Sequence, residues 1–99
     1  MYKTIFFIHK SEDHSVKTAV IERVIPALNE LFNKDIKTGN VESNLLNEEK
    51  YDIYFEVNCE NKTEFDRQMN SPQGRNVNKD LAGIFNYVTI YSIDFNGEK

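Results

Sequence analysis

The side chains best placed for acid–base chemistry are a tyrosine and a glutamate on one predicted strand. Tyr54 and Glu56 stand two residues apart in YDIYFEVNCE (51–60), and this spacing sends both side chains out of a strand on the same face. If the alternating apolar residues of the strand pack on helices, the pair faces an interior in which partial desolvation raises the pKa of the carboxyl group, as a general base requires. The competing hypothesis is that the pair lies at a dimer interface and meets Lys or Arg side chains of a second copy.

His9 is the other candidate for proton transfer. It ends the first predicted strand, and imidazole is the side chain most easily poised to gain or lose a proton near neutral pH. The alternative is a structural histidine whose ring makes one hydrogen bond at the end of a strand. Thr89 and Tyr91 on the last predicted strand would add polar contacts to the interior that Tyr54 and Glu56 face. His9 and Glu56 are therefore the catalytic candidates, and Tyr54 and Tyr91 are candidates for ligand binding.

A Ser-Pro pair and a lone arginine make the stretch NSPQGRNVNKDLAGIF (70–85) look like a motif. Serine at an N-cap followed by proline at the first helical position is a start signal for a helix, so the favoured interpretation is that this stretch separates two helices. In the other interpretation, Arg75 and the neighbouring amides also bind an anion. Arg75 is thus a further ligand-binding candidate.

The composition excludes several kinds of site and partner. A single cysteine, Cys59, rules out an internal disulfide and has no zinc-binding spacing with His9 or His14. No Gly-rich phosphate loop is present, and we expect no metal and no cofactor. A net charge of -4 disfavours nucleic acid as a partner, because that binding needs clustered Lys and Arg. No apolar run approaches the ~20 residues that cross a membrane and no secretion signal is visible, so a cytoplasmic protein without membrane contact is expected.

The elements that would position the candidate residues follow from hydrophobic periodicity. The chain is predicted to be one domain, 1–99, with these elements in order: a strand (2–10), an amphipathic helix (16–32) that bends at Pro26, an irregular strand (33–49), a strand (51–60), a short helix capped by Thr63, a second helix from Ser71 to Phe85, and a strand (87–95). Ser11 and Asp13 are candidate caps for the first helix. This order predicts the α+β, ferredoxin-like βαββαβ arrangement, an antiparallel four-stranded sheet with helices on one face.

The first and last strands carry apolar side chains on both of their faces. In the first strand, Phe6 and Ile8 alternate with Ile5 and Phe7. Helices cover only one face in the predicted arrangement, and an uncovered aromatic face would be larger than the apolar patches that monomers usually expose. A second copy of the chain is the economical cover. The sequence therefore predicts a homodimer in which two facing sheets form a dimeric α+β barrel.

The segment MNSPQGRNVNKDLAGIFN (69–86) resembles a segment near the end of EthD-like proteins, in which a Ser-Pro pair is followed by small and polar residues, an Asp and a Phe that closes the helix. The matching residues here are Ser71, Pro72, Asp80 and Phe85, and the strand order is similar across nearly the whole chain. The resemblance implies a single EthD-like domain of the dimeric α+β barrel group. That group includes cofactor-independent monooxygenases, muconolactone isomerase-like enzymes and many proteins of unknown role. Related barrels can also accommodate a flavin or a haem, although no pattern here calls for either.

One departure from the family pattern bears on chemistry. The family often has a histidine two residues before a proline late in its first helix. Pro26 matches that proline, but Val24 occupies the histidine position. The usual catalytic candidate is missing, so the resemblance implies the fold rather than a reaction.

Two functions remain open at this stage, and whether the protein is an enzyme is left undecided. The first is a dimer that binds a small apolar or aromatic metabolite, with or without transforming it, in a cleft between sheet and helices lined by His9, Tyr54, Glu56 and Tyr91. The second is a non-catalytic dimeric interaction protein with a filled interface. An RNA-recognition module is disfavoured, because Asp52 and Glu56 put negative charge where RNA would lie.

Overall fold

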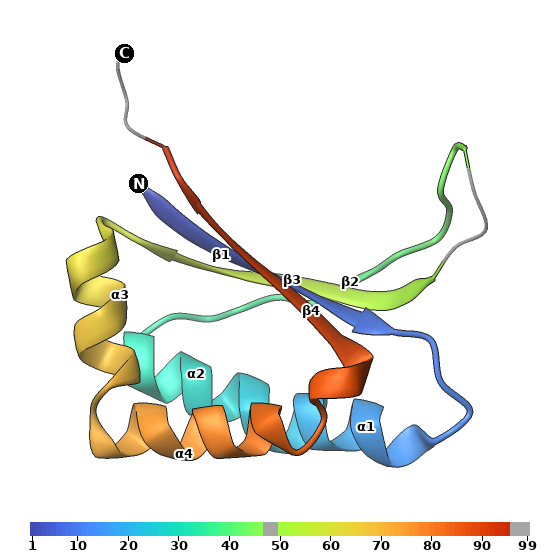
Figure 1. The fold of residues 1–99 in the computed structure, drawn as a ribbon, viewed down its shortest axis with the longest axis horizontal. Helices are drawn as coiled ribbons and strands as arrows, with labels where there is room; N and C mark the ends of the chain where they lie inside the picture. Colours follow the sequence, from blue (N-terminus) through green and yellow to red (C-terminus); the bar gives the residue numbers. More distant parts are fainter. Residues whose placement is uncertain (47–49, 96–99) are drawn as a thin grey trace.

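Over residues 1–46 and 50–95, which the computed structural model describes, the chain forms a four-stranded antiparallel sheet with helices packed on one of its faces (Figure 1). The elements in order are β1 (Tyr2–His9), α1 (His14–Ala19), the π-helical turn η1 (Val20–Val24), α2 (Ile25–Phe32), β2 (Gly39–Asn40), β3 (Tyr51–Cys59), α3 (Lys62–Met69), α4 (Pro72–Ala82), the 3-10 turn η2 (Phe85–Tyr87) and β4 (Val88–Asp94). The strands lie in the order β2-β3-β1-β4, and β1 is antiparallel to both of its neighbours. The predicted ferredoxin-like fold is confirmed.

The core lies between the two layers and uses one alternating set of side chains from each central strand. Phe6 of β1 and Phe55 of β3 are register partners, and their rings stack with centroids 4.5 Å apart. The first helical stretch contributes residues at the predicted helical spacing, among them Val20, Val24 and Leu28, which are fully buried. Burying one large aliphatic side chain is worth about 1.5–3 kcal/mol, so these contacts hold the helices on this face of the sheet.

A β-bulge near the start of β3 interrupts the simple alternation of that strand. Ile8 pairs with Ile53, whereas His9 pairs with Tyr51, so Asp52 is the extra residue. Because the bulge adds one residue, Tyr51 points to the opposite face from the one it would have in an unbroken strand. The alternation predicted for 51–60 therefore holds only from Ile53 onward.

Pro26 lies in a continuous helical stretch, where its missing N–H would cost about 3 kcal/mol in a straight α-helix. The residues just before α2 form the π turn η1, and the Ile25 N–H bonds to the Val20 carbonyl. The wider turn makes room for the proline ring, as π-bulges do at other helix irregularities. The structure shows this π turn just before the proline, and the bend itself stays a prediction.

The segment between α2 and β3 is mostly irregular. It begins at Asn33, whose left-handed backbone (φ 52°) ends α2. Among the described residues of this segment, Gly39 and Asn40 form β2 and pair with β3, so the irregular strand predicted over 33–49 shrinks to two residues. Positions 47–49 of that prediction lie outside the described residues.

Side-chain caps mark where the helices begin. Asp13 caps α1 and Ser71 caps α4, as the sequence predicts. The cap of α3 is Asn61, whose side chain accepts a hydrogen bond of 2.8 Å from the Glu64 N–H. The prediction that Thr63 caps this helix is wrong, because Asn61 already satisfies the free N–H group of its first turn.

The last helix stops earlier than predicted. It ends at Ala82, and Phe85 falls in η2 with 70% of its surface exposed. The prediction that Phe85 closes the helix is wrong. An aromatic side chain is instead left on the surface beside the start of β4.

Gly74 should be hard to replace, because α4 passes close to the end of α3 at this point. A Cβ there would lie 2.3 Å from the Gln68 carbonyl oxygen and 2.5 Å from backbone atoms of Met69. Since backbone atoms cannot move aside cheaply, we expect Gly74→Ala to lower the free energy of unfolding by about 3 kcal/mol. Gly83→Ala is the matched control: the atom nearest its Cβ would lie at 3.4 Å, and its effect should stay below about 1 kcal/mol. Urea denaturation measures both variants, and equal stabilities would contradict this packing.

Candidate functional site

The sheet face that points away from the helices carries most of the predicted site residues. We call it the open face, because no helix covers it within the part of the chain that the structure describes (Figure 1). Alternation along the paired strands places the following side chains on it: Lys3, Ile5, Phe7 and His9 from β1, Tyr51, Tyr54, Glu56 and Asn58 from β3, and Thr89, Tyr91 and Ile93 from β4. His9, Tyr54, Glu56 and Tyr91 thus share one surface.

Glu56 is held by two neighbours on the open face. The Tyr54 hydroxyl donates a hydrogen bond to its carboxylate, and the Lys3 ammonium lies 3.2 Å from the same group. The predicted cation therefore comes from the same chain. The hydrogen bond from Tyr54, followed by Lys3, holds the pKa of Glu56 below its usual value in spite of partial burial. Burial, followed by the contact with Glu56, raises the pKa of Tyr54 to about 12.

These contacts correct the expected chemistry of Glu56. The prediction that desolvation raises the pKa of Glu56 is wrong, because hydrogen bonds and a cation favour the ionised form more strongly than burial disfavours it. A carboxylate with a lowered pKa accepts hydrogen bonds well but is a weak general base. The geometry therefore suits Glu56 to binding a donor group.

His9 lies toward the opposite end of the open face from Glu56. Its Nε2 atom lies 2.6 Å from the Thr89 hydroxyl oxygen, which matches the structural interpretation of this residue. Glu56 is the register partner of Ile5, four residues along β1 from His9, and that separation corresponds to roughly 13 Å. The two catalytic candidates share a face but do not touch, and their roles in proton transfer stay predictions.

Aromatic rings gather on the open face toward the end of β1 and the start of β3. The Phe7 ring centroid lies 4.7 Å from that of Tyr51 and 5.5 Å from that of Tyr54; we call these three residues the aromatic strip. Tyr51 reaches this face because of the bulge, which turns Asp52 toward α1. There the Asp52 carboxylate lies 3.6 Å from the Lys17 ammonium. The prediction that Asp52 belongs on the open face is therefore wrong.

The other two ligand-binding candidates lie in different layers. Tyr91 is opposite Ile5 on β4 and is 57% exposed, so its ring is available on the open face. Arg75 is exposed on α4, in the helical layer on the other side of the sheet (Figure 1). The fold does not bring Arg75 together with the other candidates, and the Ser71 region acts as a helix start.

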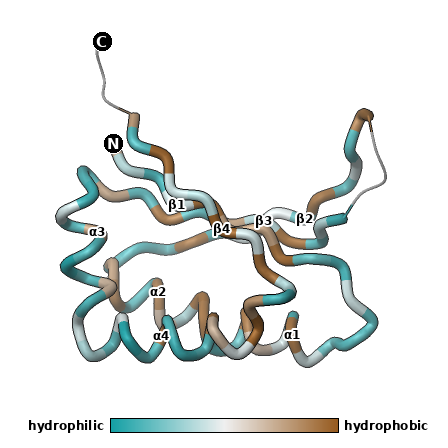
Figure 2. The backbone as a smooth tube through the Cα atoms, in the orientation of Figure 1, coloured by the Kyte–Doolittle hydropathy of each residue, from teal (hydrophilic) through white to brown (hydrophobic). Residues whose placement is uncertain are grey.

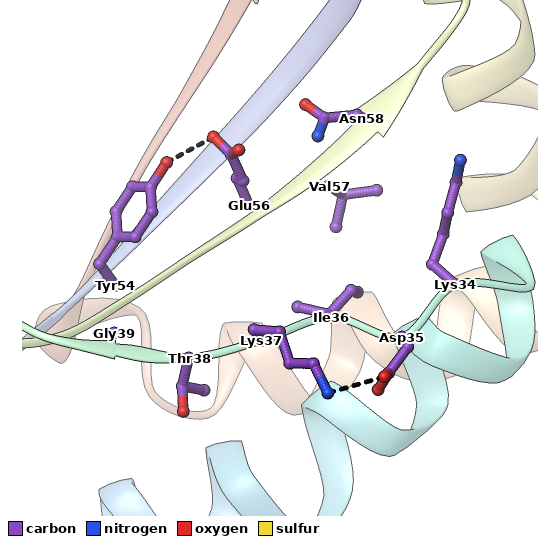
Figure 3. Close-up of a pocket in the computed structure, with 10 residues that line it drawn as sticks. All are labelled: Lys34, Asp35, Ile36, Lys37, Thr38, Gly39, Tyr54, Glu56, Val57 and Asn58. Carbon is purple, nitrogen blue, oxygen red and sulfur yellow. Dashed lines mark hydrogen bonds and ion pairs between the residues drawn. The ribbon is translucent and has the colours of Figure 1, made fainter.

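A pocket of about 490 Å³ opens at the β3 edge of the sheet, beside Tyr54 and Glu56 (Figure 3). Its opposite wall is the segment 34–39, which carries an ion pair of 2.7 Å between Asp35 and Lys37. Because β2 is so short, this segment diverges from the edge of β3 and the space opens between them. Sequence reasoning missed this wall, since no motif in the segment signals where it leaves the sheet.

The predicted cleft between sheet and helices is not where the candidate residues lie. Tyr54 and Glu56 point away from the helices, because the alternating residues Phe55 and Val57 are the ones buried in the core. The candidate site is therefore the open face together with the pocket at its β3 edge.

Residues 1–46 and 50–95 contain no group of three or more His, Cys, Asp and Glu side chains that could hold a metal ion. None of their helices is long and apolar enough to cross a membrane. Cys59 is buried, and burial raises the pKa of its thiol, so it is a packing residue rather than a nucleophile.

Removing the Tyr54 hydroxyl should raise the pKa of Glu56 toward its ordinary value of 4.5, because that hydrogen bond is the main cause of the lowering. A lowered pKa means that the ionised carboxylate stabilises the fold above pH 4.5 and that this contribution is lost as the pH falls through the folded-state pKa. Tyr54→Phe should therefore lose less stability than the wild type below that pH. Carbon-detected NMR titration of the Glu56 carboxyl measures the shift, with Tyr91→Phe as control. An unchanged Glu56 pKa in Tyr54→Phe would show that the hydrogen bond does not set it.

Comparison with known proteins supports the fold. No family model matches the chain, and no curated protein matches it in sequence. Its structure is similar to that of an ethyl tert-butyl ether D (EthD) family protein from Bacillus halodurans, with a TM-score of 0.76 and 16% identity over 96% of this chain and 98% of that one. A dimeric ferredoxin-like protein of unknown function from Jannaschia gives a TM-score of 0.75 and 11% identity, covering 95% and 98%. Another from Thermobifida fusca gives 0.57 and 15%, covering 95% and 90%. The chain therefore has the ferredoxin-like fold of these proteins, among them the EthD family protein that the sequence resemblance anticipates.

Proposed function

We propose that this chain is a homodimer in which the open faces of two copies pack together, and that the dimer binds a small apolar or aromatic molecule beside Tyr54 and Glu56. The observation that carries the proposal is a sheet face that bears the aromatic strip and that no helix of the described residues covers. Similar structures from Jannaschia and Thermobifida fusca are described as dimeric, which supports a second copy as the cover.

The open face has the charge balance that an interface needs. Its ammonium group, Lys3, and its carboxylate, Glu56, are paired with each other, and Lys3 also lies 5.9 Å from the centre of the Phe95 ring. Buried charges are tolerated when they are paired and hydrogen-bonded. Aromatic side chains such as Tyr91 are enriched in the centres of interfaces. A second sheet can therefore cover this face without burying an unpaired charge.

The pocket supplies the binding site in this proposal. A volume of about 490 Å³ falls within the roughly 300–1,000 Å³ of small-molecule sites. Tyr54 and Glu56 belong both to the pocket and to the open face, so a second sheet would roof the pocket on one side. The tyrosine ring offers a stacking surface and the ionised carboxylate accepts a hydrogen bond. The favoured ligand is a small aromatic molecule that carries a hydroxyl or amine donor.

A dimer with a filled interface and no ligand is the second candidate function. The observation that favours it is the close packing of the aromatic strip, which already fills part of the open face. In that case the strip would meet its counterpart in the partner and leave no space between the sheets. The two candidates share the dimer and differ in whether the pocket takes a ligand.

A charge placed on the open face should dissociate the dimer. Tyr91→Asp would bury an unpaired carboxylate, which costs several kcal/mol, so we expect the dissociation constant of the dimer to rise at least about 100-fold. Ile21→Asp is the matched control, because Ile21 is also an exposed apolar residue but lies in the helical layer. Sedimentation velocity over a concentration series gives the dissociation constants. Equal constants for Tyr91→Asp and Ile21→Asp would place the interface elsewhere.

Filling the pocket should abolish ligand binding without unfolding the protein. A Cβ added at Gly39 would meet Tyr54 at an ordinary 3.9 Å, so Gly39→Leu should extend into the pocket and leave the backbone in place. A panel of aromatic and polyketide-like compounds is screened by NMR, and we expect hits to shift the Tyr54 and Glu56 signals in the wild type but not in Gly39→Leu. A panel without hits, or hits that persist in the variant, would favour the filled interface.

A further inference from the structure

Two adjacent leucines in the segment after β2 are almost fully exposed. Leu45 and Leu46 are 96% and 89% exposed, although leucine is among the residues most often buried. They belong to residues 41–46, which we call the arm. The arm rises from the sheet on the side of the open face, away from the helices (Figure 1), and its tip is hydrophobic (Figure 2). An exposed pair of this kind marks a contact with another molecule.

The base of the arm is fixed at one edge and one end of the sheet. The Val41 N–H donates a hydrogen bond of 2.9 Å to the Asp52 carbonyl at the start of β3. The start of β3 pairs with the end of β1, and the end of β1 pairs with Val88 at the start of β4. The arm and the start of β4 thus lie at the same end of the strands but at opposite edges of the sheet.

A second exposed apolar surface lies at that opposite edge. Phe85, Tyr87 and Ile90 are all exposed, and we call them the β4 patch. Ile90 is the register partner of buried Phe6 and points to the helix side of the sheet, yet it remains 44% exposed. Because the full width of the sheet separates the arm from the β4 patch, one chain cannot use its own arm to cover its own patch.

We propose that Leu45 and Leu46 of each chain pack on the β4 patch of the partner, so that the two copies exchange arms. This inference rests on the face-to-face dimer proposed above. A twofold axis parallel to the strands sets the β2 edge of each chain beside the partner's β4 edge and keeps the same strand ends together. An axis running across the strands would set like edges together and leave both arms far from the β4 patches. Of these two arrangements, the axis parallel to the strands is the one that covers the leucine pair and the β4 patch. By symmetry the same contact forms twice in each dimer.

The arm is long enough for this contact. Facing sheets lie about 10 Å apart, and five residue steps from Val41 to Leu46 span up to about 17 Å in an extended chain. The tip can therefore pass the edge of the partner's sheet and reach its helix side, which is the side to which Ile90 points. The direction of the arm in Figure 1, away from its own helices, agrees with this path.

Cross-linking between two different single variants tests the exchange directly. Leu46→Cys and Phe85→Cys chains are mixed, allowed to exchange subunits and treated with a short bismaleimide. We expect a covalent two-chain product from the mixture and none from either variant alone. Native Cys59 is buried and its thiol pKa is raised by burial, so it should not react. A mixture of Leu46→Cys with Ile21→Cys, which carries its cysteine in the helical layer, is the control and should give no product.

A second variant measures how much the arm contributes to the dimer. Leu45→Ser with Leu46→Ser removes apolar contact from an exposed loop, so the fold should persist by circular dichroism while the dissociation constant rises at least about tenfold. The arm exchange would be overturned, and the dimer retained, if the wild type sediments as two chains but both expected results fail. In that case the mixture gives no cross-linked product and the double serine variant keeps the wild-type dissociation constant. A wild-type protein that sediments as one chain would overturn both.

Discussion

A β-sheet has two faces, and the helices of this chain cover one of them. On the covered face, Phe6 and Phe55 pack into a closed core with the helices. On the other face, no helix within residues 1–46 and 50–95 covers the aromatic strip or Tyr91. Removing apolar surface from water is the main driving force of both folding and association, at roughly 25 cal/mol for each Å². The dimer, the roofed pocket and the exchanged arms that we propose are all consequences of that one uncovered face.

The charges on this face explain why it suits binding better than proton transfer. Glu56 receives a hydrogen bond from Tyr54 and lies beside Lys3, and these contacts offset part of the desolvation cost of enclosing its charge. The same contacts lower its pKa and make it a poor base. His9, the other titratable candidate, already pairs with Thr89. Both titratable side chains are thus hydrogen-bonded and share the face with aromatic rings, which is the composition of a ligand site or an interface.

The sequence was most informative where a local pattern has one physical cause. Alternation placed Tyr54 and Glu56 on one face, and the Ser71 cap predicted the start of α4. Features that depend on distant partners could not be read in this way. The pKa of Glu56 is set partly by Lys3, 53 residues away along the chain, and the pocket exists because the segment after α2 pairs with β3 for only two residues. The bulge at Asp52 also depends on how β3 pairs with β1, and no residue type in β3 predicts it.

Sedimentation equilibrium of the wild-type chain at micromolar concentration is the most direct measurement of whether the open face is covered. The account predicts a mass of twice the 11.6 kDa chain, with dissociation only on strong dilution. A mass of 11.6 kDa at every concentration would contradict it, because the aromatic strip and Tyr91 would then face water in the native protein.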